Sequence, residues 1–293
     1  MAVLIDPPSW PAHGTVFSHL VSTWSLEELH AFAATAGIPR RAFDEDHYDV
    51  PALRYRDLVE QGARVVSGAE LVRALIASDL RIPARRRGPK LRAVLLTRWE
   101  AFLPEVPALG GELLDRWTEP HRRYHTTAHL LAVLEALDQL LEPADEPLRD
   151  VVLLAAWFHD AVYEGAAGED ERASAALAVE RLHSIVSDSV SGEVERLVLL
   201  TVTHAPEPQD RAGQLLCDAD LSVLGSGTSE YARYVAAVRD EYAHIPAKEF
   251  TEGRRVVLQR LLALDPLYRT AEGRKRWTWR ARANLERELA SLA

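Results

Sequence analysis

A break rich in proline and arginine at residues 82–90 most constrains how this chain can fold. Its sequence, Ile-Pro-Ala-Arg-Arg-Arg-Gly-Pro-Lys, interrupts any regular hydrophobic spacing. We predict a linker over residues 83–90, which separates a first domain at residues 1–82 from a second at residues 91–293. A total of 293 residues is typical of two domains. An arginine cluster in such a linker is more often a solvated tether than an anion-binding or nucleic-acid-binding site.

Short strands and helices alternate before this break, which predicts a small α/β domain. The capping-box pattern Ser25-Leu26-Glu27-Glu28 opens a helix, and Gly37 closes it. The other expected elements are strands at residues 2–6 and 63–66 and helices at residues 52–61 and 70–77.

After the break, apolar residues recur with helical spacing and prolines fall near the expected helix ends. The chain is therefore predicted to be mainly α, with an all-helical bundle preceded by the small α/β domain. The expected helices cover residues 91–102, 110–117, 124–141, 147–158, 170–187, 192–203, 229–244, 246–264 and 273–292.

Composition narrows the class of protein. The single cysteine, Cys217, excludes a disulfide framework and a zinc cluster of several thiolates. No apolar run reaches the roughly 20 residues of a membrane span. The N-terminus lacks the basic region and apolar core of a secretory signal. We expect a cytoplasmic protein without a membrane partner. The sequence is compatible with a homo-oligomer and does not decide the oligomeric state.

The charge distribution bears on the partners. The formal net charge is −10, and residues 1–90 carry 11 basic and 11 acidic side chains, so the whole acidic excess lies in the second domain. A surface of that sign repels duplex nucleic acid and disfavours a nucleic-acid partner. A small phosphorylated substrate remains compatible, because a bound metal ion dominates the field around it.

Histidines in the second domain have spacing typical of a metal site. His125 and His129 lie four residues apart in an expected helix, so both side chains would share one helical face. Imidazole is the commonest metal ligand in proteins. A chain with 11 histidines produces such pairs by chance, so this pair is weak evidence on its own.

Polar residues that follow apolar runs strengthen the prediction of a metal site. An apolar run at residues 151–158 ends in His159 and Asp160, and Asp218 and Asp220 follow another apolar stretch. Burying these groups costs free energy unless they have a partner, and a metal ion supplies one. In the ordinary alternative, His159 bonds a backbone carbonyl and Asp160 caps the next helix.

The spacing of these residues resembles the H…HD…D pattern of the HD-domain metal-dependent phosphohydrolases, over about residues 91–270. Residues 117–125 read Trp-Thr-Glu-Pro-His-Arg-Arg-Tyr-His, which is similar to predicted small HD phosphohydrolases. Tyr124-His125-x-x-x-His129 and Ala219-Asp220-Leu221-Ser222 are similar to the related cyclic-nucleotide phosphodiesterases. The purine-clamping glutamine and second helical half of those phosphodiesterases are not recognisable, so cyclic-nucleotide specificity is not implied.

The resemblance implies an enzyme that cleaves a phosphomonoester or phosphodiester, with nucleotides among the candidates, by a metal-activated hydroxide. It implies one or two divalent ions, chosen from Mn, Fe, Ni, Co, Zn and Mg. The proton donor would be His125, and Asp160 would be catalytic because it can bridge two ions. The implied metal ligands are His129, His159, Asp160 and Asp220. The alternative function is a non-catalytic HD module that senses a nucleotide or acts as a scaffold.

Four more residues are candidates for contacts to substrate or to the ligands: His204, Glu164, Arg122 and Asp218. Asp218 also rivals Asp220 as a ligand. His204 is equally compatible with a capping or surface position. Arginine beside a helix start is usually solvated, which is the ordinary alternative for Arg122.

Residues 1–82 resemble a small domain of unknown function that occurs alone or fused to such phosphohydrolases. The matching phrases are Leu4-Ile5-Asp6-Pro7-Pro8-x-Trp10, Ser18-His19-Leu20 and Asp46-His47-Tyr48-Asp49-Val50-Pro51. A candidate second polar site at strand ends comprises Asp6, His13, His19, His47 and Asp49. A hydrated loop rich in aspartate and histidine is the ordinary alternative.

Overall fold

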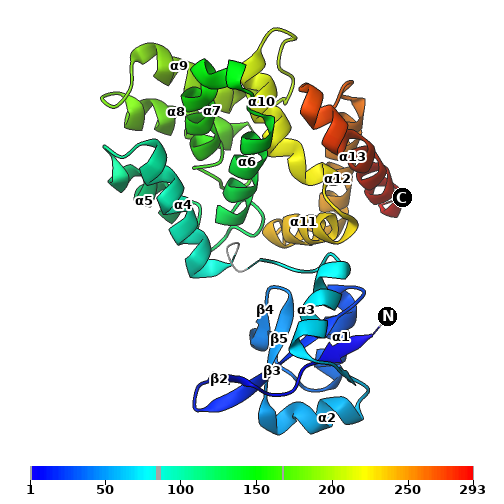
Figure 1. Ribbon diagram of the computed structural model, residues 1–293. Coiled ribbons are helices and arrows are strands. Elements are labelled where there is room, and N and C mark those ends of the chain that lie inside the picture. Colours follow the sequence, from blue (N-terminus) through cyan, green and yellow to red (C-terminus); the bar gives the residue numbers. More distant parts are fainter. Residues whose placement is uncertain (1, 84–86, 167, 293) are drawn as a thin grey trace. The chain divides into compact units, whose positions relative to one another are not determined.

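The computed structural model describes residues 2–83, 87–166 and 168–292 (Figure 1). They divide into two units, one made almost wholly of residues before Gly88 and the other almost wholly of the rest. The fold is mainly α with a small α/β unit first, as the sequence predicted. The first helix of the second unit begins at Gly88, so the expected linker at residues 83–90 overlaps it, and residues 84–86 lie outside the described residues. No described helix is long and apolar enough to cross a membrane.

A mostly antiparallel sheet forms the centre of the first unit, with strand order β4-β5-β3-β1-β6 and β2 paired to β3. Only the β1–β6 pairing is parallel among the described strands. The strands are β1 (Val3–Ile5), β2 (Trp10–Ala12), β3 (Thr15–Ser22), β4 (Phe43–Asp44), β5 (His47–Pro51) and β6 (Arg64–Val65). The sequence predicted β1 and β6 and missed the others. In β3, Leu20, Val21 and Ser22 are all buried, so the polar–apolar alternation of a strand is lost there.

Helices pack on both faces of this sheet. Side chains of α1 (Leu26–Thr35) and α2 (Tyr55–Glu60) join one core cluster with Ile5 and Leu20, whereas α3 (Gly68–Ala77) packs against Leu4 and Val21. Successive strand residues thus bury opposite faces, as the period of two requires.

The expected capping box at the start of α1 is only half formed. The Ser25 hydroxyl accepts the Glu28 backbone N–H at 3.2 Å, but the Glu28 carboxylate accepts from the Ser22 hydroxyl at 2.5 Å instead of returning to Ser25. A complete box caps α3 through Ser67 and Glu70. The expected helix at residues 52–61 divides into a 3₁₀ turn and α2.

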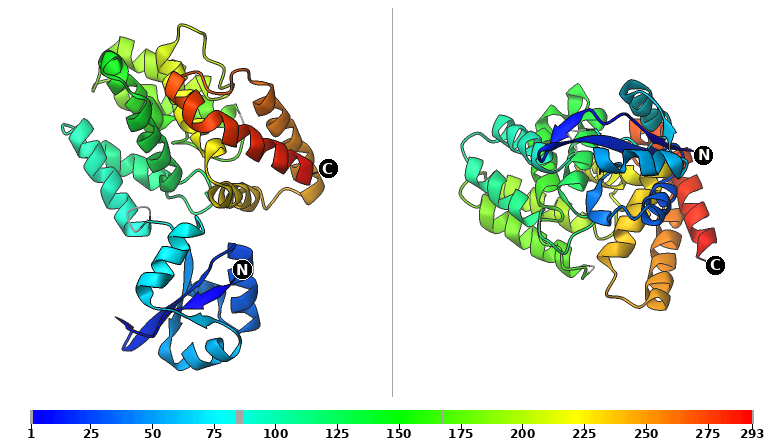
Figure 2. Two further views of the ribbon diagram at one scale, coloured as in Figure 1. Left: turned by 45° about the vertical axis from the view of Figure 1, so that its right-hand side comes forward. Right: turned by 90° about the horizontal axis from the view of Figure 1, so that it is seen from below.

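The second unit is helical, and Figure 2 shows its long last helix, α13, alongside α12. Its helices are α4 (Gly88–Phe102), α5 (Pro107–Arg116), α6 (Thr127–Leu140), α7 (Glu146–Phe158), α8 (Glu169–Leu182), α9 (Asp188–Leu200), α10 (Arg211–Asp220), α11 (Thr228–Glu241), α12 (Ala247–Ala263) and α13 (Ala271–Ser291). The sequence missed α10, which contains a glycine and two aspartates of low helix propensity. Packing against α6, α7 and α9 overrides that propensity.

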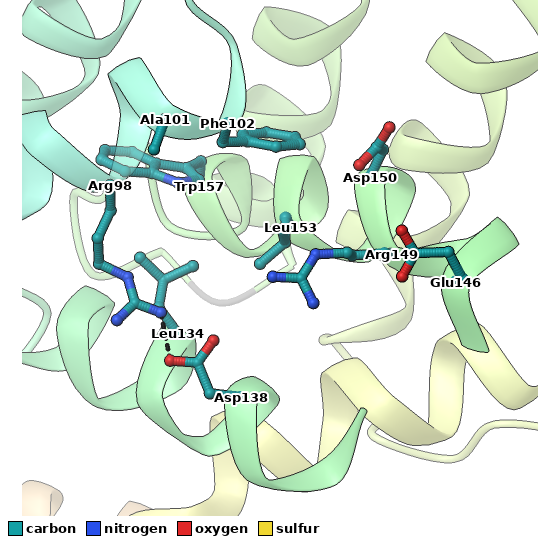
Figure 3. Close-up of a pocket in the computed structure, with 10 residues that line it drawn as sticks. All are labelled: Arg98, Ala101, Phe102, Leu134, Asp138, Glu146, Arg149, Asp150, Leu153 and Trp157. Carbon is teal, nitrogen blue, oxygen red and sulfur yellow. Dashed lines mark hydrogen bonds and ion pairs between the residues drawn. The ribbon is translucent and has the colours of Figure 1, made fainter. Parts of the chain in front are cut away.

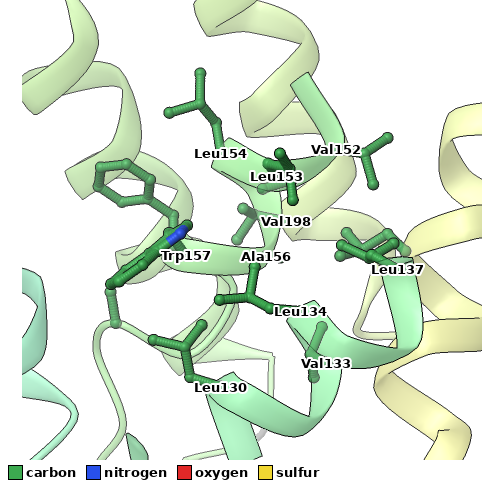
Figure 4. Close-up of a cluster of buried hydrophobic side chains, with 14 of the residues drawn as sticks. Leu130, Val133, Leu134, Leu137, Val152, Leu153, Leu154, Ala156, Trp157 and Val198 are labelled. Atoms are coloured by element: carbon green, nitrogen blue, oxygen red, sulfur yellow. The ribbon is translucent and has the colours of Figure 1, made fainter. Parts of the chain in front are cut away.

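Apolar side chains of helices α4 to α10 form the main core of the second unit, and Figure 4 shows side chains from α6, α7 and α9 in it. Leu130, Leu134 and Leu154 are at most 1% exposed, and each such side chain contributes roughly 1.5–3 kcal/mol on burial. The buried Trp117 indole donates to the Trp157 carbonyl at 3.1 Å. This core fixes the ends of α6 and α7, where the polar side chains lie.

Candidate metal centre

Four side chains from three helix ends converge inside the second unit. His129 lies in the first turn of α6, His159 and Asp160 directly follow the last turn of α7, and Asp220 is the last residue of α10. These three helices pack against one another (Figure 1). The sequence-predicted ligands are therefore brought together by the packing of α10, the helix that sequence reasoning missed.

The ligand atoms of these side chains face one another. The Nε2 atoms of His129 and His159 are 3.2 Å apart. Asp220 Oδ1 lies 3.0 Å from His129 Nε2 and 3.7 Å from His159 Nε2. Asp160 Oδ2 lies 3.1 Å from His159 Nε2 and 3.7 Å from His129 Nε2. Two imidazole nitrogens and one carboxylate oxygen within 4.8 Å of one another, with Asp160 Oδ2 beside the imidazoles, suit a divalent transition metal.

Neighbouring groups orient the ligands. The His159 Nδ1–H donates to the Ala156 carbonyl at 2.8 Å, which leaves Nε2 free to coordinate. His129 Nδ1 lies 3.1 Å from the Tyr124 hydroxyl. Metal-binding histidines usually have such a partner on the second ring nitrogen.

His204 orients the Asp220 carboxylate in the same way. Its Nε2 lies 2.7 Å from Asp220 Oδ2, on the carboxylate oxygen that the two histidine ligands do not share. The backbone of His204 has φ 51°, a left-handed conformation that is costly for a residue other than glycine. The structure thus places His204 in contact with a ligand, one of the two roles that the sequence left open.

Burial and charge set the protonation of the cluster. Burial raises the pKa of the Asp160 and Asp220 carboxyls, but the facing histidines outweigh it and hold both pKa values below the usual range. For His129, burial outweighs the effect of the two carboxylates and lowers the pKa below its ordinary value. For His159 the two carboxylates prevail over burial and raise the pKa well above its ordinary value. The two carboxylates therefore favour a positive charge between the rings, which a proton on His159 or a bound cation would supply.

His125 lies beside this cluster but outside α6. The helix begins at Thr127 with Thr126 as its cap, so the expectation that His125 and His129 share one helical face is wrong. Glu241, the last residue of α11, fixes His125 instead: Glu241 Oε1 lies 2.6 Å from His125 Nδ1. The other oxygen, Oε2, accepts three successive backbone N–H groups, those of residues 123–125.

This contact also determines the charge of His125. Burial lowers the pKa of His125, but the Glu241 carboxylate and the cluster aspartates outweigh it and raise the pKa above its ordinary value. The pKa of Glu241 falls to about 2, because the hydrogen bond to His125 outweighs the effect of burial. The Tyr163 ring stacks on the imidazole with ring centroids 4.0 Å apart. The Glu241 carboxylate thus favours the charged form of His125.

Three other candidates from the sequence have different roles. Arg122 is buried and donates to the carbonyls of residues 125, 160 and 161, so it fixes the backbone around the cluster and is not available to a substrate. Asp218 accepts the N–H groups of Arg269 and Thr270, both at 2.7 Å, and anchors the start of α13 rather than a metal. Glu164 is exposed, and none of the cluster contacts among the described residues involves it.

Sequence reasoning missed Glu241, Tyr124 and Tyr163. Glu241 is 116 residues from His125 and lies in an ordinary charged stretch, Arg-Asp-Glu-Tyr, without a motif. Tyr124 adjoins a recognised phrase, but only the turn before α6 brings its hydroxyl to His129. These contacts depend on tertiary packing, which local spacing does not encode.

A surface pocket of about 350 Å³ lies between α4, α6 and α7 (Figure 3). Charged side chains rim it, among them the Arg98–Asp138 ion pair at 2.5 Å. None of its lining residues belongs to the histidine–aspartate cluster, so its chemistry is separate from that of the candidate metal centre.

Comparison with known proteins describes only the first unit. A family model described as "Protein of unknown function (DUF4031)" matches residues 3–78, which confirms the expected likeness to a domain of unknown function. No curated protein and no solved structure matches the chain. The chemistry of the second unit therefore rests on its own residues.

Proposed function

We propose that the second unit is a metal-dependent phosphohydrolase of the HD-domain type, which cleaves a phosphomonoester or phosphodiester. The observation that carries the proposal is the convergence of two imidazole Nε2 atoms and two carboxylates within the distances given above. The histidine side chains are at most 3% exposed, whereas those of Asp160 and Asp220 are 15% and 14% exposed. The carboxylate side of the cluster is thus the side open to a substrate.

His129, His159 and Asp220 fit a divalent cation, because their donor atoms all lie within 4.8 Å of one another, and Asp160 Oδ2 lies beside both imidazoles as the fourth donor. When bound, the cation supplies Lewis acidity and neutralises charge on phosphoryl oxygens. Asp160 contacts the histidine pair through Oδ2, so its other oxygen is compatible with a second ion. The donor set suits Mn, Fe, Ni, Co or Zn, with Mg at an oxygen-rich second position.

His125 supports a catalytic function rather than a binding function alone. Glu241 holds its Nδ1–H and favours the charged imidazole, in which the Nε2–H is the group that can protonate a leaving alkoxide oxygen. The side chain is 22% exposed and within reach of solvent. The alternative, a module that binds a nucleotide without hydrolysing it, has no need of a charged donor held by its own carboxylate.

A metal titration combined with hydrolysis of p-nitrophenyl phosphate and bis(p-nitrophenyl) phosphate tests the proposal. We expect Mn²⁺, Ni²⁺ or Co²⁺ to bind the full chain and support turnover. Asp160→Ala should lose both the ion and activity, His125→Ala should keep the ion and lose turnover, and the exposed His183→Ala should change neither. A chain that binds no ion, or that stays inactive with every ion, would contradict the proposal. Tight nucleotide binding without product would favour the alternative.

A further inference from the structure

The sheet unit carries a second group of histidine and carboxylate side chains on one face. His19 on β3 stands directly opposite Asp49 on β5 in the antiparallel register. His47 precedes Asp49 by two residues on β5, so the alternation of the strand places it on the same face. Residues far apart in the chain thus meet at one place on the sheet.

The donor atoms of these side chains converge on one carboxylate oxygen. Asp49 Oδ1 lies 3.4 Å from His47 Nε2 and 4.0 Å from His19 Nε2. Donor atoms of the three residues all lie within 4.8 Å of one another. His13, which the sequence grouped with them, is exposed and packs against Phe17 instead.

A buried carboxylate holds the other nitrogen of each imidazole. His19 Nδ1 lies 3.0 Å from Asp6 Oδ2, and the other oxygen of Asp6 accepts the His19 backbone N–H. His47 Nδ1 lies 2.6 Å from Asp46 Oδ1. The Asp6 and Asp46 side chains are 8% and 0% exposed. Each Nδ1–H therefore points to a carboxylate and each Nε2 toward Asp49, as in carboxylate–histidine–metal groupings.

The carboxylates on and behind this face differ in their ion-pair partners. Arg87 pairs with Asp46 through a contact of 2.6 Å and with Asp44 at 3.3 Å. Arg87 thus offsets the charge of Asp44 and Asp46, and Asp49 is the carboxylate that faces the two Nε2 atoms. A hydrated surface loop has no need of buried carboxylates behind each ring.

We propose that His19, His47 and Asp49 bind a divalent transition-metal ion of the Zn²⁺ type, independently of the centre in the helical unit. Two imidazoles and one carboxylate favour such an ion over Ca²⁺ or Mg²⁺, which prefer oxygen ligands. Three protein ligands leave a fourth position for water or a small anionic ligand. The Asp49 and His19 side chains are 44% and 28% exposed, so solvent reaches that position.

The test is Zn²⁺ and Co²⁺ binding to the full-length chain, measured by calorimetry and by the visible absorption of Co²⁺. His159→Ala combined with Asp220→Ala first removes the donors of the helical unit. In that background we expect one ion per chain, with visible bands typical of four-coordinate Co²⁺. Asp49→Asn or His47→Ala should weaken binding at least about 100-fold, and Asp46→Asn about 10–100-fold. The exposed His13→Ala is the matched control and should bind as the background does.

No Zn²⁺ binding in the background, or unchanged binding after Asp49→Asn, would overturn the proposal. If the background variant is unfolded by circular dichroism, Asp49→Asn is compared with the otherwise unaltered chain, where it should lower the Zn²⁺ stoichiometry by one ion. The half-exposed Asp49 tolerates an isosteric amide, so loss of binding there is not loss of folding. Because the readout is binding to the sheet unit, its result is separate from that of the phosphohydrolase assay.

Discussion

Glu241 and His125 form a carboxylate–imidazole pair with a distance of 2.6 Å across 116 residues of sequence. The same carboxylate accepts the backbone N–H groups of residues 123–125, so it fixes both the position and the charge of the histidine. The end of α11 thereby positions a charged imidazole beside a cluster contributed by α6, α7 and α10.

Glu241→Gln should lower the pKa of His125, because it removes the carboxylate that stabilises the imidazolium. A nearby opposite charge is worth about 1–3 pKa units. Because the raised pKa favours the imidazolium, the variant loses that proton at lower pH than the unaltered chain, and the alkaline limb of the hydrolysis profile moves to lower pH with it. Titration of the imidazole by NMR measures the shift, and an unchanged pKa would refute the role assigned to Glu241.

His204→Ala should weaken metal binding by about 10–100-fold, because it removes the partner that orients the Asp220 carboxylate. Calorimetry with Mn²⁺ measures the change, with the exposed His183→Ala as control. Equal affinities in the two variants would show that the contact between His204 and Asp220 does not matter for the ion.

Arg122→Ala should lower the free energy of unfolding of the metal-free protein by about 3 kcal/mol, because it leaves buried carbonyls without donors. Arg149→Ala, at an exposed position, should cost less than about 0.5 kcal/mol. Urea unfolding compares the two. Unchanged stability with a raised KM in Arg122→Ala would instead support the substrate contact expected from the sequence.

Asp145, the residue before α7, contacts Arg211, the first residue of α10, at 2.8 and 2.7 Å, and hydrogen bonds from Arg211 lower the pKa of Asp145 despite its burial. A carboxylate with a lowered pKa in the folded state adds stability above its unfolded pKa of about 3.9, and that stability is lost as the pH falls through the folded pKa. Asp145→Asn should therefore cost about 1–3 kcal/mol at neutral pH, and the difference should shrink below about pH 4. Urea unfolding across pH measures it, and a constant difference would contradict this assignment.

Local spacing, together with the resemblance to HD-domain phosphohydrolases, indicated His129, His159, Asp160 and Asp220 in the second unit, but it did not indicate Glu241. His159 and Asp160 end an apolar helix, and such an end is recognisable because its polar groups follow a buried run. The start of α6 was misplaced, because Thr126 caps it while His125 is held from elsewhere. The position of α10 depends on burial among three neighbours, which overrides the weak propensity of its sequence.

In the first unit the histidines and aspartates were recognisable, but their arrangement was not. His19 and Asp49 meet because β3 pairs with β5, and the sequence of either strand alone does not specify this pairing. The partner of each imidazole is set by this register. His13 was grouped with these residues from the sequence, but its side chain packs against Phe17, outside the group.

X-ray diffraction from crystals of the full chain grown with Mn²⁺, recorded with anomalous scattering, tests the metal centre most directly. We expect an anomalous peak at about 2.0–2.3 Å from His129 Nε2 and His159 Nε2, with carboxylate oxygens of Asp160 and Asp220 completing the ligands. We also expect His125 to remain on Glu241 and not to bind the ion. A Mn²⁺-loaded crystal with no peak between the two histidines, or with His125 as a ligand, would contradict the proposed metal centre.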